Sequence, residues 1–342
     1  MLAERHLPAV RFQRVGEGME TFLLILVVVV VIRTFFLLPS AIPSGSMQPT
    51  LYGVTVADRR DDAAFRMPGR WRAWIERFCH GRIYYHVVAR APGRLEAVRP
   101  PESRWSWLPL PLFRVQRFRV GDAWYRIPAP PGEWAAKSRA GVADAGLFLR
   151  LAGVDPERVY QTGEVILQAV LQAGDRVLVD RLTYQFRRPR RGEIVVFRPR
   201  NVPGLKTDTF YLKRLVGLPG ERIRISDDRR LWINGRPLDP NTPPFRRVFS
   251  FHGPPRPGRY AGYLNERQAR RYWPGLRGLS PFFPTGRVER RIPNDAVALL
   301  GDNTMESSDS RQWGWVPERD LVGRVLWVYW PCGGRWGRGF TR

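Results

Sequence analysis

An unbroken apolar run near the N-terminus constrains the fold of this chain more than any other feature. Residues 22–32 read FLLILVVVVVI, and after Arg33 and Thr34 the apolar character continues to Leu38. This length is at the short end of what crosses a bilayer as a helix, and Arg33 lies near its end, where a long side chain can reach the interface. We therefore predict a transmembrane helix over residues 21–38.

The distribution of basic residues predicts how this helix is oriented. Arg5, Arg11 and Arg14 precede the apolar run, whereas residues 39–58 contain no Lys or Arg. Because basic residues are retained in the cytoplasm, we expect residues 1–20 to be cytoplasmic and the rest of the chain to lie outside. The protein would thus be a single-pass protein of the inner or plasma membrane, with its main domain on the outer (periplasmic or extracytoplasmic) face.

Two other interpretations of the apolar run are less favoured. A cleavable signal peptide would need a small-residue cleavage motif, and Pro39 interrupts that pattern. A helix buried in a soluble core would normally show a polar stripe, which the Val/Leu run lacks.

The net charge of +25 points toward an anionic membrane surface more than toward nucleic acid. The basic residues are spread along the chain, and there is no zinc-finger spacing or RNA-binding aromatic motif, so nucleic acid is not an expected partner. Cys79 and Cys332 form no CxxC pair, and no cofactor or metal is expected. If the chain is exported, these two cysteines could pair, and the sequence leaves this open.

The second half of the chain has a β-type pattern. Residues 174–182 and 192–200 alternate in polarity around a basic turn, Asn234-Gly235 is a hairpin signal, and residues 322–330 read as a last strand. We predict a mostly-β fold: an antiparallel β-sheet catalytic domain after one N-terminal transmembrane helix. The region 239–292 reads as an irregular, cap-like segment with a short helix at 265–272.

Ser46 is a candidate nucleophile. It lies in PSGSMQPTL, where prolines on both sides favour an extended chain and Gly45 allows close approach of a substrate. In an extended chain, Ser44 would point to the same side as Ser46, so its hydroxyl could join the Ser46 backbone N–H as an oxyanion hole.

A serine needs a base, and Lys213 is the candidate. None of the four histidines lies in a motif, which disfavours a Ser-His-Asp triad. A lysine can accept a proton only when burial has lowered its pKa, and apolar residues flank Lys213 in TFYLKRLVGLPG. A third segment, GDNTMESSDSRQWGWVPE (301–318), places Ser307, Asp309 and Arg311 at alternate positions. Asp309 and Arg311 could equally be a weak surface pair.

Taken in order, these segments resemble the type I signal peptidase (leader peptidase) family of Ser–Lys serine proteases. PSGSMQPTL is similar to that family's serine box, GDRVLVDRL to the strand that follows it, YLKRLVGLPGE to the lysine box, and GDNTMESSDSRQWGWVPE to the last box. The resemblance covers roughly residues 20–53, 174–225 and 296–330.

The resemblance implies a role for each matching residue. Ser46 would be the nucleophile and Lys213 the general base, and Ser44 would complete the oxyanion hole. Ser307 would hydrogen-bond to Lys213, Asp309 and Arg311 would brace the site as an ion pair, and Met47 would pack beside the nucleophile. The implied reaction is cleavage of signal peptides from exported preproteins after a small residue. The implied partners are preprotein signal peptides, the phospholipid membrane and, as a further expectation, the secretion machinery.

The chain departs from the family pattern in one place. The serine box and the Gly-Asp strand should be close in sequence, yet residues 54–173 separate them. We therefore predict a catalytic domain made of residues 39–53 and 174–342, with 54–173 as an insertion. A long excursion from a turn adds little closure entropy, so the core can tolerate it.

The insertion contains six tryptophans, namely Trp71, Trp74, Trp105, Trp107, Trp124 and Trp134. Two interpretations are equally open: a surface for lipid headgroups or substrates, or a self-packed subdomain with Trp in its core. For the whole protein, the alternatives are a Ser–Lys peptidase with a dedicated client and an inactive membrane-anchored scaffold.

Overall fold

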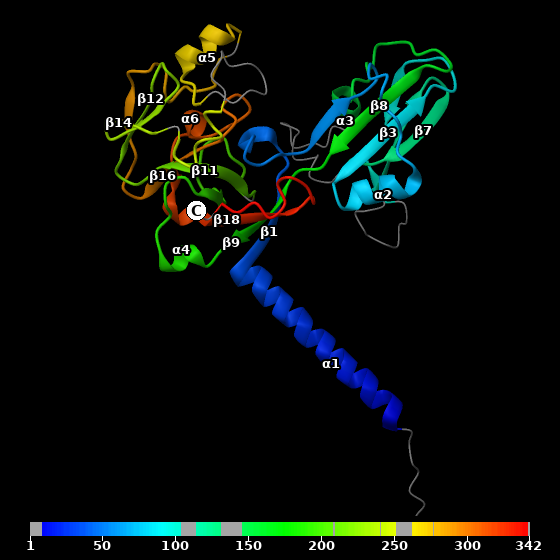
Figure 1. The fold of residues 1–342 in the computed structure, drawn as a ribbon, viewed down its shortest axis with the longest axis horizontal. Coiled ribbons are helices and arrows are strands. Elements are labelled where there is room, and N and C mark those ends of the chain that lie inside the picture. The colour runs from blue at the N-terminus through cyan, green and yellow to red at the C-terminus, as the bar shows by residue number, and fades with distance from the viewer. Residues whose placement is uncertain are drawn as a thin grey trace, which may run out of the picture.

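The computed structural model describes residues 9–103, 114–130, 146–207, 209–239, 241–250, 262–275 and 277–340. Helix α1 (Ala9–Val31) continues as a π-helical turn, η1 (Ile32–Phe36), and stands apart from the rest of the molecule (Figure 1). The 20 residues Glu17–Phe36 are long and apolar enough to cross a membrane, and none is buried. A long, largely apolar and unburied helix supports the predicted membrane span.

The end of this helix differs from the prediction. Leu37 and Leu38 were expected to be helical but begin strand β1 (Leu37–Ala41). Pro39 disfavours helical backbone for the residue before it, and β1 instead pairs antiparallel with β9 (Arg176–Asp180). Helix α1 and η1 therefore lead directly into the sheet.

A seven-stranded antiparallel sheet forms the main body of the molecule. Its strand order is β1-β9-β18-β10-β11-β16-β17. The remaining strands of this sheet are β10 (Ile194–Phe197), β11 (Tyr211–Gly217), β16 (Ala296–Leu300), β17 (Val316–Pro317) and β18 (Leu321–Trp330). The predicted strands at 174–182, 192–200 and 322–330 are confirmed as β9, β10 and β18, and so is the mostly-β antiparallel class.

This sheet is buried on both faces. Along β10, Ile194 and Val196 pack with Met47 on one face, whereas Val195 and Phe197 pack with Leu215 on the other. All four β10 side chains are buried, which explains why IVVF is a continuous apolar run rather than an alternating one. Short helices α4 (Thr183–Phe186) and α6 (Ser310–Trp313) and the turn η5 (Glu318–Asp320) connect its strands.

A second sheet, in the order β14-β13-β12-β15, packs beside the first. The predicted hairpin is confirmed between β13 (Leu231–Ile233) and β14 (Arg236–Pro237), where Asn234 and Gly235 have φ of 49° and 76°. The other two strands are β12 (Arg222–Ile225) and β15 (Glu289–Arg291).

The cap-like region 239–292 contains helix α5 (Glu266–Tyr272), as predicted. Asn265 caps α5 by accepting a hydrogen bond from the Gln268 N–H. Residues 251–261 of this region lie outside the described part of the chain.

Residues 54–173 (the 54–173 segment) form two further sheets around a core of their own. One sheet has the order β2-β8-β3, and in the other β6 pairs with β4, β5 and β7. The elements are β2 (Thr55–Asp58), α2 (Arg70–Phe78), β3 (Arg82–Val88), β4 (Leu95–Val98), β5 (Glu102–Ser103), β6 (Arg114–Val120), β7 (Ala123–Pro128), α3 (Leu147–Leu151) and β8 (Val165–Gln172). Figure 1 shows this segment beside the main sheet. That residues 54–173 are an insertion relative to the family pattern remains a prediction.

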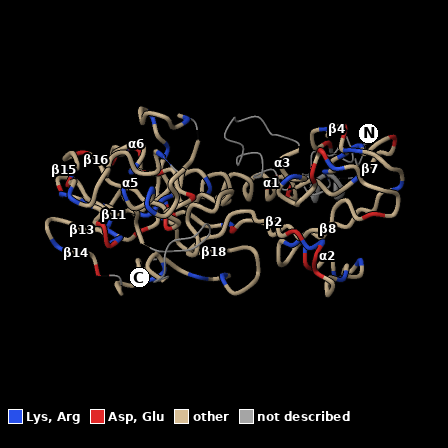
Figure 2. The backbone as a smooth tube through the Cα atoms, turned by 90° about the horizontal axis from the view of Figure 1, so that it is seen from above, with Lys and Arg blue, Asp and Glu red and all other residues tan. Residues whose placement is uncertain are grey.

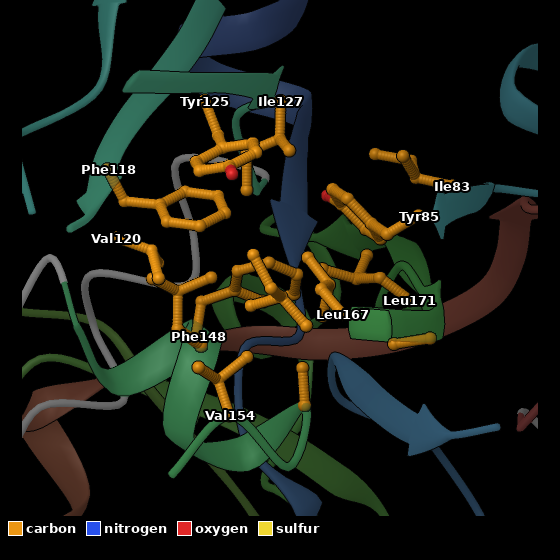
Figure 3. Packing of buried hydrophobic residues seen from close by; sticks show 14 of the residues in the cluster. Ile83, Tyr85, Phe118, Val120, Tyr125, Ile127, Phe148, Val154, Leu167 and Leu171 are labelled. Atoms are coloured by element: carbon orange, nitrogen blue, oxygen red, sulfur yellow. The ribbon is translucent and has the colours of Figure 1, made fainter. Parts of the chain in front are cut away.

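Among the described residues of the 54–173 segment, tryptophan does not build the core. Figure 3 shows a cluster of Tyr, Phe and aliphatic side chains that includes Tyr85, Phe118 and Phe148. Trp71 and Trp74 on α2 are instead 82% and 56% exposed, and Trp124 is also exposed. The interpretation in which Trp forms the core is therefore wrong for these three; Trp105, Trp107 and Trp134 lie outside the described residues.

Candidate active site

Ser46 lies on a short 3-10 helix, η2 (Gly45–Met47), which follows β1. The sequence predicted an extended chain here. A 3-10 turn forms instead, because the Gln48 N–H bonds locally to the Gly45 carbonyl at 3.0 Å rather than to a neighbouring strand. The turn directs Ser46 toward β11 and leaves the residue 6% exposed.

Lys213 reaches Ser46 from strand β11. Its Nζ lies 2.9 Å from Ser46 Oγ and 3.1 Å from the Leu212 carbonyl oxygen. A distance of 2.9 Å is within the reach that proton transfer requires. Residues 46 and 213 are far apart in the chain, so the sheet alone brings together the two side chains that the sequence proposed as a pair.

The surroundings of Lys213 favour its neutral form. Burial is the largest influence and lowers the pKa of Lys213 to about 8, and the positive charge of Arg311 acts in the same direction. Asp309 and Asp302 raise the pKa by smaller amounts. Because desolvation penalises the ammonium form, about half of Lys213 is unprotonated near pH 8, and this neutral form can accept a proton.

Ser44 also lies at this site. Its hydroxyl is 3.2 Å from Ser46 Oγ, so the two serines do share one side of the chain despite the helical turn. Met47 is buried and packs with Leu51 and Val177 beneath the turn. The contribution of Ser44 to an oxyanion hole remains a prediction.

The turn Gly301-Asp302-Asn303 holds the serine segment in place. The Asn303 backbone N–H donates to the Ser46 carbonyl at 3.0 Å, and its side-chain amide donates to the Gly45 carbonyl at 3.2 Å. A Cβ at position 301 would lie 2.1 Å from Ser307 Oγ and 2.6 Å from the Ser46 carbonyl oxygen. Only glycine allows this approach, so Gly301 sets the distance between the two segments.

Asp309 and Arg311 form a fully buried ion pair. Arg311 Nη2 lies 2.8 Å from Asp309 Oδ2, and both side chains are 0% exposed. Burial raises the pKa of Asp309, but the Arg311 charge and its hydrogen bonds outweigh burial, so the pKa of this carboxyl lies below its usual value. Asp309 also accepts the Gly301 N–H at 3.0 Å. The alternative of a weak surface pair is therefore wrong.

Ser307 lies in the same cluster but does not make the predicted contact. Among the described residues, Lys213 Nζ hydrogen-bonds to Ser46 and Leu212 and not to Ser307. The Ser307 hydroxyl packs against Gly301. It is near enough to the Asp309 carboxylate to help lower the pKa of that group, but without the geometry of a full hydrogen bond. The negative charge of Asp309 attracts this hydroxyl, while the Leu212 carbonyl already holds the amine.

Sequence reasoning missed a second buried ion pair. Arg214 Nη2 lies 2.5 Å from Asp302 Oδ2, both side chains are buried, and the Thr50 hydroxyl also bonds to Asp302. The signal was present in the adjacent letters Lys213-Arg214, because neighbouring residues on a strand point to opposite faces. Lys213 therefore faces Ser46, while Arg214 lines a cavity of about 610 Å³ together with Arg190, Arg246 and other residues.

Within the described ranges, no group of three or more His, Cys, Asp and Glu side chains is arranged to hold a metal ion.

Comparison with known proteins shows that this chain is similar to signal peptidases. The family model "Signal peptidase, peptidase S26" matches residues 148–330, a range that includes Lys213 and the Gly301–Arg311 cluster but not Ser46. A probable signal peptidase I-2 from Synechocystis is 32% identical over 168 residues, which are 48% of this chain and 59% of that protein. The chain thus spans less than two thirds of this relative.

Other relatives are matched over more of their length. The signal peptidase I of Leptolyngbya laminosa is 29% identical over 60% of this chain and 87% of its own length. The signal peptidase I of Pseudomonas fluorescens is 28% identical over 54% of this chain and 68% of its own. A crystal structure of a signal peptidase I from Enterococcus faecalis covers 41% of this chain and 97% of its own, at 26% identity and a TM-score of 0.27.

Proposed function

The chain belongs to the signal peptidase family, peptidase S26, and on this premise we propose that it is a membrane-anchored signal peptidase I. It would cleave N-terminal signal peptides from exported preproteins after a small residue. The observation that carries the proposal is the 2.9 Å contact between Lys213 Nζ and Ser46 Oγ, with the pKa of Lys213 lowered to about 8.

The proposed reaction is acyl transfer in two steps. Lys213 takes the proton of Ser46 as Ser46 Oγ attacks the scissile carbonyl, and the ammonium then gives that proton to the leaving amine. Water next attacks the acyl-enzyme, Lys213 again accepting a proton and returning it to Ser46 Oγ. The Ser44 hydroxyl and the Ser46 backbone N–H would bind the oxyanion in both steps.

The remaining residues of the site act through position. The Asp309–Arg311 pair holds Gly301, and the neighbouring Asn303 holds the backbone of Ser46. Ser307 lies within this cluster and would accept a hydrogen bond from Lys213 once the amine is protonated and has a third N–H to donate. Short side chains around the scissile bond would fit shallow pockets, which exclude larger residues sterically.

The proposed topology follows from the anchor. Helix α1 would cross the membrane with residues 1–20 in the cytoplasm, and the sheets would lie on the outer face. Because η1 leads directly into β1, the main sheet would lie close to the bilayer surface, where signal peptide cleavage sites emerge. The preprotein and the phospholipid surface are the proposed partners, with contact to the secretion machinery as a further proposal.

Helix α2 gives the 54–173 segment a proposed role at the membrane. Trp71, Trp74 and Ile75 lie on one face of α2 and are exposed, and Arg70 and Arg72 flank them. A basic helix with exposed Trp and Ile is typical of helices that lie in a lipid interface. Figure 1 shows α2 on the side of the segment toward which α1 extends, and Figure 2 shows basic residues over both halves of the molecule.

Vesicle binding tests this role of α2. The double variant Trp71→Ser/Trp74→Ser should lower co-sedimentation with anionic phospholipid vesicles at least about fivefold in a form that lacks residues 1–36 and so keeps β1. Trp124→Ser, which removes another exposed tryptophan of the segment, is the matched control and should bind like the parent form. Equal binding by the double variant would reject α2 as a lipid-docking helix.

Cleavage of a preprotein in detergent–lipid micelles tests the main proposal. The wild-type chain should cut after the small residue, and Ser46→Ala and Lys213→Ala should abolish cleavage. Lys206→Ala, a change at an exposed lysine away from the site, should leave cleavage unchanged. If the wild-type chain cleaves none of several preproteins, the general signal peptidase proposal falls. Cleavage of a client protein that binds to the chain would then favour a dedicated-client peptidase, and no cleavage of any client would favour an inactive scaffold.

A further inference from the structure

We propose that Cys79 and Cys332 form a disulfide bond that fastens the 54–173 segment to the end of the main sheet. Cys79 directly follows helix α2, and Cys332 lies two residues beyond β18. The Cys332 backbone N–H donates to the Cys79 carbonyl at 2.7 Å. The chain therefore brings its two cysteines together across a separation of more than two hundred residues.

This backbone contact limits the distance between the two α-carbons. Even a straight path from one Cα to the other through the hydrogen bond would span only about 7 Å, and the bend at the carbonyl shortens it. Disulfides join α-carbons about 4.4–6.8 Å apart. Both thiols are free and exposed, so an oxidant can reach them.

The surrounding contacts hold the two strands of backbone in this arrangement. Trp330 Nε1 donates to the Phe78 carbonyl at 2.6 Å. Phe78 directly precedes Cys79, and Trp330 lies two residues before Cys332. A Cβ on Gly81 would lie 2.7 Å from the Trp330 ring, so the glycine lets the indole pack closely. Trp330 therefore fastens the backbone on both sides of Cys79, beside the contact between the two cysteine backbones.

The reaction needs a disulfide-bearing oxidant, such as a thiol–disulfide oxidoreductase or a small disulfide, outside the cytoplasm. One cysteine thiolate attacks a sulfur of the oxidant and releases one thiolate. The second cysteine attacks the mixed disulfide and releases the other, so two electrons and two protons pass from the cysteines to the oxidant. This inference rests on the proposed outward topology, because cytoplasmic thiols stay reduced.

Peptide mapping without reduction tests the bond directly. Full-length protein in membranes is trapped with N-ethylmaleimide and digested with trypsin, which releases residues 78–82 (FCHGR) and 325–335 (VLWVYWPCGGR). We expect a linked pair of these peptides that separates after reduction. The proposal would be overturned if both peptides were recovered fully alkylated from two samples: protein taken directly from cells, and protein treated with glutathione disulfide.

Three controls distinguish this inference from its premises. Cys332→Ser should abolish the linked pair, and moving the thiol with Cys332→Ser/Gly334→Cys should lower its yield at least about fivefold. A link that forms with glutathione disulfide but is absent from cells would overturn its presence in the working protein. Preprotein cleavage by the same samples reports separately on the proposed function, since Cys79 and Cys332 take no part in that chemistry.

A thermal measurement tests the effect of the bond. If the disulfide fastens the two halves, reduction should lower the Tm of the wild type by about 5 °C and leave the Tm of Cys79→Ser unchanged. Equal Tm values for oxidised and reduced wild type would show that the bond does not fasten the halves.

Discussion

The main sheet and the 54–173 segment are both built from antiparallel strands, but they bury different kinds of side chain. Around the main sheet lie Lys213 and the ion pairs Arg214–Asp302 and Asp309–Arg311, all buried. In the described part of the 54–173 segment, Gln116 is the one buried polar residue, and the rest of its core is apolar or tyrosine.

This difference indicates what each region is built for. Burying charges costs free energy that only precise partners can offset, so an apolar core is the simpler way to be stable. The main sheet accepts that cost where it lowers the pKa of Lys213 and fixes the backbone of Ser46. Four predictions, from the largest expected effect to the smallest, test whether charge serves function in one region and apolar packing serves stability in the other.

The largest effect is expected from Lys213→Arg. A guanidinium stays protonated at every accessible pH, so it cannot accept the Ser46 proton, and kcat/KM for preprotein cleavage should fall by about 10⁴-fold or more. Circular dichroism should confirm that the fold is retained, because the buried positive charge is retained too. Activity within tenfold of wild type would show that Lys213 is not the base.

The second effect concerns the Asp309–Arg311 pair. Arg311→Met leaves a buried carboxylate unpaired, so urea unfolding should show a loss of about 3–5 kcal/mol. Adding Asp309→Asn should recover part of this loss, because no charge then remains unpaired. If Arg311→Met cost less than the double variant, the pair would not hold the site as described.

The third effect should fall on stability alone. Phe118 is 0% exposed and stacks on Tyr125, so Phe118→Ala should cost about 3–5 kcal/mol of unfolding free energy. Because this core lies away from Ser46, cleavage at a temperature where the variant stays folded should remain within about twofold of wild type. A loss of cleavage activity well beyond twofold in the folded variant would remove the contrast between the two regions.

The smallest effect is a pH dependence. With the pKa of Lys213 at about 8, kcat/KM should fall about tenfold per unit as pH drops below 8 and level off above it. The pKa is lower in the folded chain than in the unfolded one, so the unfolded chain binds more protons between pH 8 and about 10. The stability of wild type relative to Lys213→Met should therefore rise across this range in urea titrations. A flat rate profile from pH 6 to 9 would contradict the lowered pKa.

Local patterns in the sequence were enough for much of the fold. Periodicity identified strands β9, β10 and β18. Asn234-Gly235 predicted the hairpin between β13 and β14, and the apolar run predicted α1. The predicted local conformation of Ser46 was wrong, because an extended chain was expected and the residue lies on a 3-10 turn. Its neighbour Ser44 nevertheless lies where the prediction placed it relative to Ser46.

By itself, the sequence determined the chemical groups and the local backbone: an apolar helix, alternating strands, a serine between prolines, and a lysine among apolar residues. Only the tertiary structure decided how these groups meet. The packing of strands, turns and helix ends placed Lys213 against Ser46 and Arg214 against Asp302, kept Ser307 from Lys213, and brought Cys79 beside Cys332. Such contacts join residues far apart in the chain, so their geometry and the burial that lowers the pKa of Lys213 are set by how the strands pair rather than by any local pattern.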